Sequence, residues 1–154
     1  MTFFKEVWAA KLPLKLKIFL WQLIRNKLPT SEQVWIRHGP SSGLCTLCGE
    51  REDANHIFFH CYLVRDLLAC AWNPAGIPDF LAISTSLKGR ERRIIWLCFA
   101  AMCWTLWTIR NKMTIELSFI SSPTNCIFQM ANLLQSWRPL SARSNRRWMR
   151  RWRP

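Results

Sequence analysis

The sequence predicts a mainly α-helical protein, and three observations support this fold class. Glycine is scarce, with 5 among 154 residues, so the turn-rich pattern of a β sandwich is missing. Apolar residues recur at the i, i+3, i+4 and i+7 spacing of amphipathic helices. An apolar run over residues 94–109 has the length of a buried helix. Half of the residues are hydrophobic, so the chain can bury a core.

Two helices are predicted in the first 40 residues. The first begins near Pro13 and ends before Pro29, with apolar residues at helical spacing between them. Thr30 begins the second, short helix, because Thr30 and Gln33 have the spacing of a capping box. A Gly-Pro pair then ends it. We expect these two helices to form a hairpin.

The remainder of the chain is predicted to alternate between helical and irregular segments. Residues 63–72 have a helical pattern, whereas two Pro-containing breaks make residues 73–88 irregular. A long helix is predicted over residues 89–119 and an amphipathic one over 123–137. The chain therefore divides into a helical hairpin with a cysteine-rich knuckle (1–72), an irregular linker (73–88), a C-terminal helical segment (89–137) and a basic tail expected to be disordered (138–154).

Positive charge dominates the sequence, with 22 Lys and Arg against 9 acids and a net charge of +13. Such a surface attracts polyanions, and nucleic acid first among them. In the tail, tryptophans suited to base stacking are interleaved among arginines suited to phosphate contact, which predicts binding of RNA or single-stranded DNA without sequence specificity. A solvated end that binds nothing is the alternative. The predicted nucleic-acid-binding residues are Arg138, Arg143, Arg146, Arg147, Trp148, Arg150, Arg151 and Trp152.

The cysteine count and the N-terminus indicate an intracellular protein. Seven cysteines cannot all pair in disulfides, and the first residues lack the pattern of a signal peptide. We therefore expect a nuclear or cytoplasmic location and no secretion. The apolar run Ile94–Ile109 has 16 residues and falls short of the roughly 20 that a membrane span needs, so no membrane span is expected.

A metal site is predicted where Cys45, Cys48, His56 and Cys61 follow the spacing C-x2-C-x7-H-x4-C. Zinc prefers four nitrogen or sulfur ligands in a tetrahedron, and a Cys-x2-Cys turn places two thiolates on one side of the ion. Gly49 allows the sharp turn that follows the second cysteine. Four protein ligands leave no position for a catalytic water, so the predicted zinc is structural and folding depends on it.

The identity of the fourth ligand leaves an alternative open, because His60 lies four residues after His56. On a regular α-helix, residues i and i+4 share a face, whereas i and i+5 lie about 140° apart, which favours His60. The affinity of thiolates for zinc and the knuckle-like spacing favour Cys61, which we take as the fourth ligand. The other cysteines stand in apolar helical surroundings and are predicted to be small core residues; they are Cys70, Cys98, Cys103 and Cys126.

An ordered series of motifs runs along the chain: Leu12-Pro-Leu-Lys-Leu-Lys-Ile-Phe-Leu-Trp21, Leu28-Pro-Thr30, the Cys-x2-Cys pair, His56-Ile-Phe-Phe-His-Cys61 and Trp104-Thr-Leu-Trp107-Thr-Ile-Arg110-Asn111. Over about residues 3–138, this series resembles the reverse-transcriptase zinc-binding domain of plant LINE-type (non-LTR) retroelements. The resemblance places the metal ligands on the same four residues. It implies a zinc-binding accessory module that serves reverse transcription, associates with nucleic acid and with a reverse-transcriptase polypeptide, and has no polymerase activity.

Two departures from this family indicate a fragment or a degenerate remnant of a retroelement reading frame. Tyr62 is the only tyrosine and is followed by Leu-Val-Arg, so the Tyr-x-Asp-Asp box of a polymerase is missing. The segment between Cys61 and Trp72 is shorter than is usual in the family.

Catalysis and a small-molecule substrate are not expected, because the nine acids are scattered and form no paired-carboxylate or nucleophile–base pattern. A purely structural or protein-interaction module, or a non-functional remnant, is the alternative to nucleic-acid binding. In the interaction hypothesis, Trp96, Trp104 and Trp107 dock onto a polymerase; at helical spacing, core packing is the commoner role of such residues.

Overall fold

The computed structural model describes residues 2–10, 12–62, 76–118 and 123–149. These residues form helices and loops without a β-strand, which confirms the predicted mainly α fold. The elements in chain order are α1 (Thr2–Ala9), α2 (Leu14–Ile24), α3 (Ser31–Ile36), the π-helical turn η1 (His56–His60), α5 (Ile77–Ser86), α6 (Gly89–Ile115) and α7 (Pro123–Met149).

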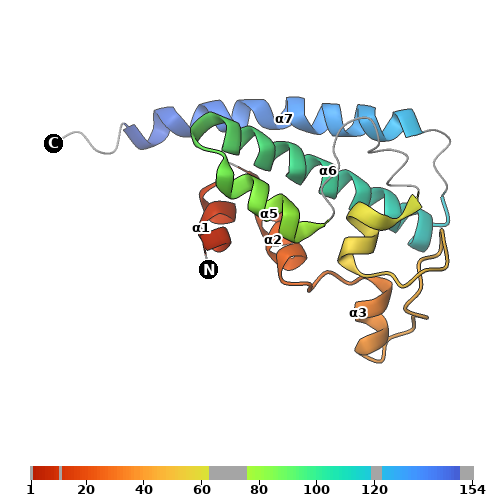
Figure 1. The fold of residues 1–154 in the computed structure, drawn as a ribbon. Helices are drawn as coiled ribbons and strands as arrows, with labels where there is room; N and C mark the ends of the chain where they lie inside the picture. The colour runs from red at the N-terminus through yellow and green to blue at the C-terminus, as the bar shows by residue number, and fades with distance from the viewer. Residues whose placement is uncertain (1, 11, 63–75, 119–122, 150–154) are drawn as a thin grey trace.

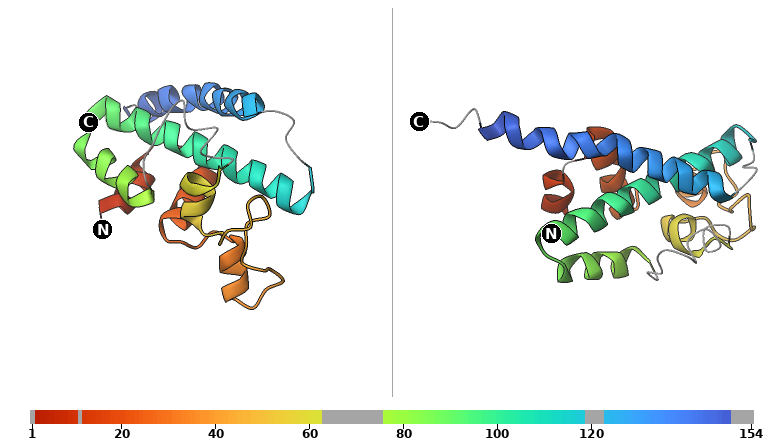
Figure 2. Two further views of the ribbon diagram at one scale, coloured as in Figure 1. Left: turned by 45° about the vertical axis from the view of Figure 1, so that its right-hand side comes forward. Right: turned by 90° about the horizontal axis from the view of Figure 1, so that it is seen from above.

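Helix α6 is the centre of the fold. It contacts α7 on one side and α2, α5 and η1 on the other (Figures 1 and 2). By length and composition alone, α6 could cross a membrane, but half of its most apolar window is buried inside the protein. Its buried side chains include Trp96, Phe99 and Leu106, as expected for the central helix of a hydrophobic core.

Aromatic side chains form two groups along α6. Phe80 of α5 stacks on Phe99 with ring centroids 3.6 Å apart, and Trp96 meets Phe80 edge-on. Further along α6, Trp104 and Trp107 pack against Phe19 of α2. Trp96 is buried, and the other two tryptophans are partly buried against the same core. Trp96 is therefore a core residue, and Trp104 and Trp107 pack against the core while remaining partly exposed.

The starts of several helices follow from the sequence signals. Pro13 precedes α2, where its fixed φ suits the first turn. Thr30 caps α3 by accepting a hydrogen bond from the backbone N–H of Gln33. Helices α6 and α7 begin at Gly89 and Pro123, as predicted.

Three predictions about the helices were wrong. The expected irregular segment contains α5, because Pro78 stands in the first helical turn, where its missing N–H costs nothing. The N-terminal helix pair forms between α1 and α2 rather than between α2 and α3. Helix α7 continues to Met149 through the segment expected to be disordered, since arginine has a high helix propensity. The helix predicted over residues 63–72 lies outside the described residues.

Candidate metal centre

The first two candidate ligands stand on a short ribbon over residues 43–52. Leu44 and Arg51 form an antiparallel bridge, and the Cys45 N–H donates to the carbonyl of Glu50 at 2.7 Å. Gly49 has φ +78°, in the left-handed region that side chains rarely adopt, and its N–H bonds to the Cys45 carbonyl at 2.8 Å. This tight turn holds the thiols of Cys45 and Cys48 at the tip of the ribbon.

The other two candidate ligands flank the π-helical turn η1. The carboxylate of Asp53 accepts a 2.6 Å hydrogen bond from the His56 N–H and so begins the turn. The Cys61 N–H then bonds to the carbonyl of His56 at 2.8 Å, which is the i to i+5 bond of a π-helix. A π turn therefore brings residue i+5 back beside residue i, where an α turn would bring i+4.

The local geometry bears on the choice between Cys61 and His60. Ligand atoms of Cys45, Cys48, His56 and Cys61 all lie within 4.8 Å of one another, and His60 is not in this group. His60 is exposed, whereas Cys61 is buried. The geometry of a regular α-helix, which favoured His60, does not apply to this segment, because it forms a π-helical turn.

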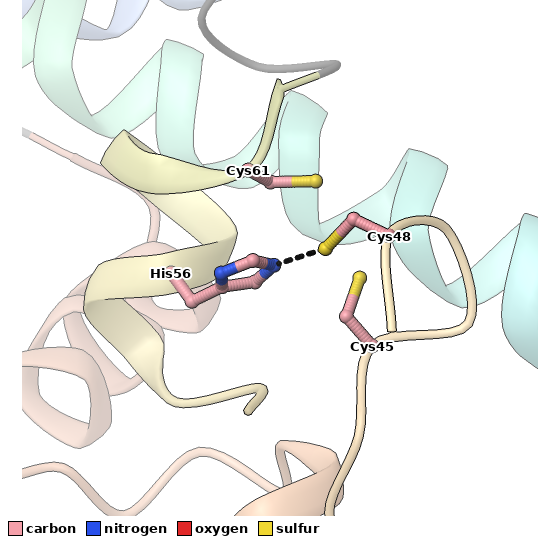
Figure 3. A group of neighbouring side chains, drawn as sticks. All are labelled: Cys45, Cys48, His56 and Cys61. Carbon is pink, nitrogen blue, oxygen red and sulfur yellow. Dashed lines mark hydrogen bonds between the residues drawn. The ribbon is translucent and has the colours of Figure 1, made fainter. Parts of the chain in front are cut away.

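The four side chains converge on a common point from two directions (Figure 3). With Zn–S near 2.3 Å and Zn–N near 2.0–2.1 Å, two ligand atoms of a zinc tetrahedron lie about 3.6–3.8 Å apart. The Sγ of Cys48 and the Nε2 of His56 are 3.1 Å apart and share a hydrogen bond. The donor set and its spacing thus fit a tetrahedral zinc ion after small side-chain movements.

The thiols of Cys45 and Cys48 hold their protons in the metal-free arrangement, because the pKa of each is raised. A hydrogen bond with Cys61, together with burial, raises the pKa of Cys45 from 9.0 to about 12. Burial also raises the pKa of Cys48. A divalent cation must displace these protons, so metal binding releases protons and weakens as the pH falls.

Helix α6 lies beside the four candidate ligands and lines one side of a small cavity there. A cavity of about 20 Å³, room for about one water molecule, separates Cys45, His56 and Cys61 from α6. The α6 side of this cavity is mostly apolar and is formed by Leu106, Ile109, Arg110 and Met113. An open hollow of about 530 Å³ lies beside Cys48 and His56 and is lined by charged and polar residues such as Asp53 and His60.

The remaining predicted residues fall in different places. Cys103 and Cys126 are buried and Cys98 is partly buried, as expected of small core residues, whereas Cys70 lies outside the described residues. Arg138, Arg143, Arg146, Arg147 and Trp148 belong to helix α7. Arg150, Arg151 and Trp152 lie outside the described residues.

Glu52 and Arg110 lie beside the cluster and were not predicted as part of the site. Their side chains form an ion pair in which the carboxylate is 1% and the guanidinium side chain 11% exposed. An acid in the knuckle and an arginine at the end of the apolar run were visible in the sequence, but nothing there paired them.

Comparison with known proteins bears on the N-terminal part of the chain. No curated protein and no solved structure matches it. A family match covers α1, α2, α3, the ribbon and η1, and it leaves α5, α6 and α7 outside. This match agrees with the donor set described above, because residues 1–67 match the family described as zinc-binding in reverse transcriptase.

Proposed function

We propose that this chain is a zinc-stabilised accessory module of a reverse transcriptase, of the kind found in plant LINE-type retroelements, and that it is not itself an enzyme. The convergence of three thiols and one imidazole within 4.8 Å carries this proposal. Four protein ligands would complete the coordination of zinc and leave no site for an activated water. The metal would therefore hold the ribbon and η1 together inside a cell that keeps thiols reduced.

Elemental analysis of the purified protein tests the zinc site. We expect one zinc per chain in the wild type and none in Cys48→Ser, whereas Cys98→Ser, a cysteine on α6 outside the group, should retain the metal. A folded wild-type chain without zinc would refute the proposed zinc site.

We further propose that the module binds RNA or single-stranded DNA through its basic end. Lys88, Arg90 and Arg93 are exposed around the start of α6. The Arg-rich end of α7 lies at the same end of the molecule (Figure 1). Clustered cations support phosphate contact without sequence readout, and the net charge of +13 strengthens the attraction.

Fluorescence anisotropy with a labelled single-stranded RNA at several salt concentrations tests this binding. Replacing Arg143, Arg146 and Arg147 by Gln should weaken binding and reduce the salt slope by about two, at about 0.7 per phosphate contact in single strands. The control replaces exposed Lys27, Arg37 and Lys112 by Gln, which removes equal charge elsewhere. Equal loss in both variants would show that net charge, and not the basic end, attracts the RNA.

An interaction module remains a second candidate because α2 exposes apolar side chains. Leu14, Ile18 and Trp21 are 63%, 42% and 38% exposed and follow the i, i+4, i+7 spacing of one helix face. Such a stripe is typical of a protein contact, here with the reverse-transcriptase polypeptide. Absence of RNA binding, combined with retained zinc, would favour this candidate.

A further inference from the structure

Glu52 is a buried acid that stands in the sequence between the two pairs of candidate ligands. Its side chain is 1% exposed, and each of its carboxylate oxygens has a partner. Oε1 accepts hydrogen bonds from the Ser31 N–H at 2.8 Å and from Arg110, and Oε2 accepts one from Arg110 Nε at 3.3 Å. A buried carboxylate is tolerated only with such partners, so its position is tightly determined.

The backbone of Glu52 connects both pairs of candidate ligands. Its N–H donates to the carbonyl of Gly43, which closes the ribbon that carries Cys45 and Cys48. The next residue, Asp53, begins η1 through its bond to the His56 N–H. A shift of Glu52 would therefore move the ribbon relative to η1 and change the distances between the two ligand pairs.

Arg110 is held in place from several sides. Its Nη1 donates to the side-chain oxygen of Asn111 at 2.9 Å, and its Nη2 donates to Ser31 Oγ at 3.2 Å. The guanidinium carbon lies 5.4 Å from the ring centre of Trp107, within the range of a cation–π contact. The planar group thus presents two N–H bonds to Glu52 in a fixed orientation, as arginine does and lysine does not.

We propose that Arg110 is a positioning residue for the metal centre and acts through Glu52 without touching the metal. Helix α6 would then belong functionally to the zinc module, although it lies beyond the matched residues 1–67. This inference rests on the proposed metal site. A merely structural role would connect Arg110 only with the stability of the fold. The proposed role also connects Arg110 with the geometry of metal coordination.

The test compares the wild-type chain with Arg110→Gln by zinc competition and by the absorption spectrum of the cobalt-substituted protein. We expect the zinc Kd of Arg110→Gln to be about tenfold higher than that of the wild type, because removing groups that orient metal ligands typically weakens metal binding by at least this factor. We also expect altered ligand-field bands, because the ligand tetrahedron relaxes. Lys112→Gln, which changes an exposed basic residue on the same helix, should leave both readouts unchanged.

A second comparison separates positioning from stability. Phe80→Leu weakens the core around Trp96 and Phe99, in the half of α6 that lies away from Arg110, and should lower Tm while leaving the cobalt spectrum unchanged. If Arg110→Gln does not fold, Arg110→Lys keeps the charge without the planar fork and should still alter the cobalt spectrum. Lower Tm with unchanged zinc affinity and cobalt spectrum in the Arg110 variant would overturn the inference. Failure of the wild type to bind either metal would instead refute the proposed metal site.

Discussion

The choice between Cys61 and His60 as fourth ligand can be decided by exchanging each residue separately. The π turn places Cys61 beside His56, so Cys61→Ser removes a ligand, whereas His60→Ala removes an exposed side chain outside the group. We expect zinc to raise the Tm of the wild type and of His60→Ala by the same amount. Cys61→Ser should show little or no rise at the same free zinc concentration.

The size of the rise follows from linkage and chain length. Zinc held at 1,000 times its Kd stabilises the folded state by about 4.1 kcal/mol if the unfolded chain does not bind it. For a chain of 154 residues, the unfolding entropy near 60 °C is about 0.32 kcal/mol per kelvin. The expected rise in Tm is therefore about 13 °C in both zinc-binding proteins.

Differential scanning calorimetry in zinc-buffered and chelator-containing solutions measures this shift. The metal-free Tm of each variant serves as its own reference, so that a general loss of stability is not mistaken for a lost ligand. The reasoning would be refuted if the zinc-dependent shift disappeared in His60→Ala and persisted in Cys61→Ser. That outcome would mean that the segment binds metal as an α turn.

Further predictions concern the thiols, the aromatic core and the ribbon turn. The raised pKa of Cys45, about 12 against 9.0, stabilises the metal-free fold fully below about pH 9, and this contribution should be lost as the pH rises toward 12 in chelator-treated unfolding experiments. Phe99→Ala should cost about 3–5 kcal/mol in urea unfolding, because Phe99 is buried and stacks on Phe80. Gly49→Ala should cost about 1–2 kcal/mol from its φ of +78° alone, since no atom lies within 4 Å of the added Cβ; a cost near zero in urea unfolding would contradict this. Cys103 is fully buried with a raised pKa and should resist alkylation in the folded protein, as mass spectrometry of iodoacetamide-treated samples can show.

Local signals predicted the starts of helices better than their ends or their partners. Thr30 and Pro123 mark helix starts because capping and a fixed φ act within a few residues. Helix α5 was not predicted, because a proline such as Pro78 can break a helix or stand in its first turn, and the local sequence does not distinguish the two. The end of α7 was not predicted either, because an arginine-rich segment is compatible with both a solvated helix and a disordered tail.

The candidate site was predictable in its residue types but not in its supports. Three cysteines and a histidine at zinc-like spacing stand within 17 residues of sequence, so a local pattern is enough to predict them as ligands. The contact between Glu52 and Arg110 joins residues 58 positions apart, and no local pattern specifies such a pair. The π turn was equally inaccessible, because sequence periodicity distinguishes helix from strand and not one helical hydrogen-bonding pattern from another.

The π turn also has a consequence for how this motif can vary in length. A turn closed by an i to i+5 bond contains one residue more than an α turn and returns the chain to nearly the same place. Deleting one residue between His56 and Cys61 would let the segment close as an α turn with the same two side chains on one face. A His-x3-Cys chain and a His-x4-Cys chain could therefore bind the same ion in the same way. The number of residues between the two ligands would then depend on the type of helical turn and not on the shape of the metal site.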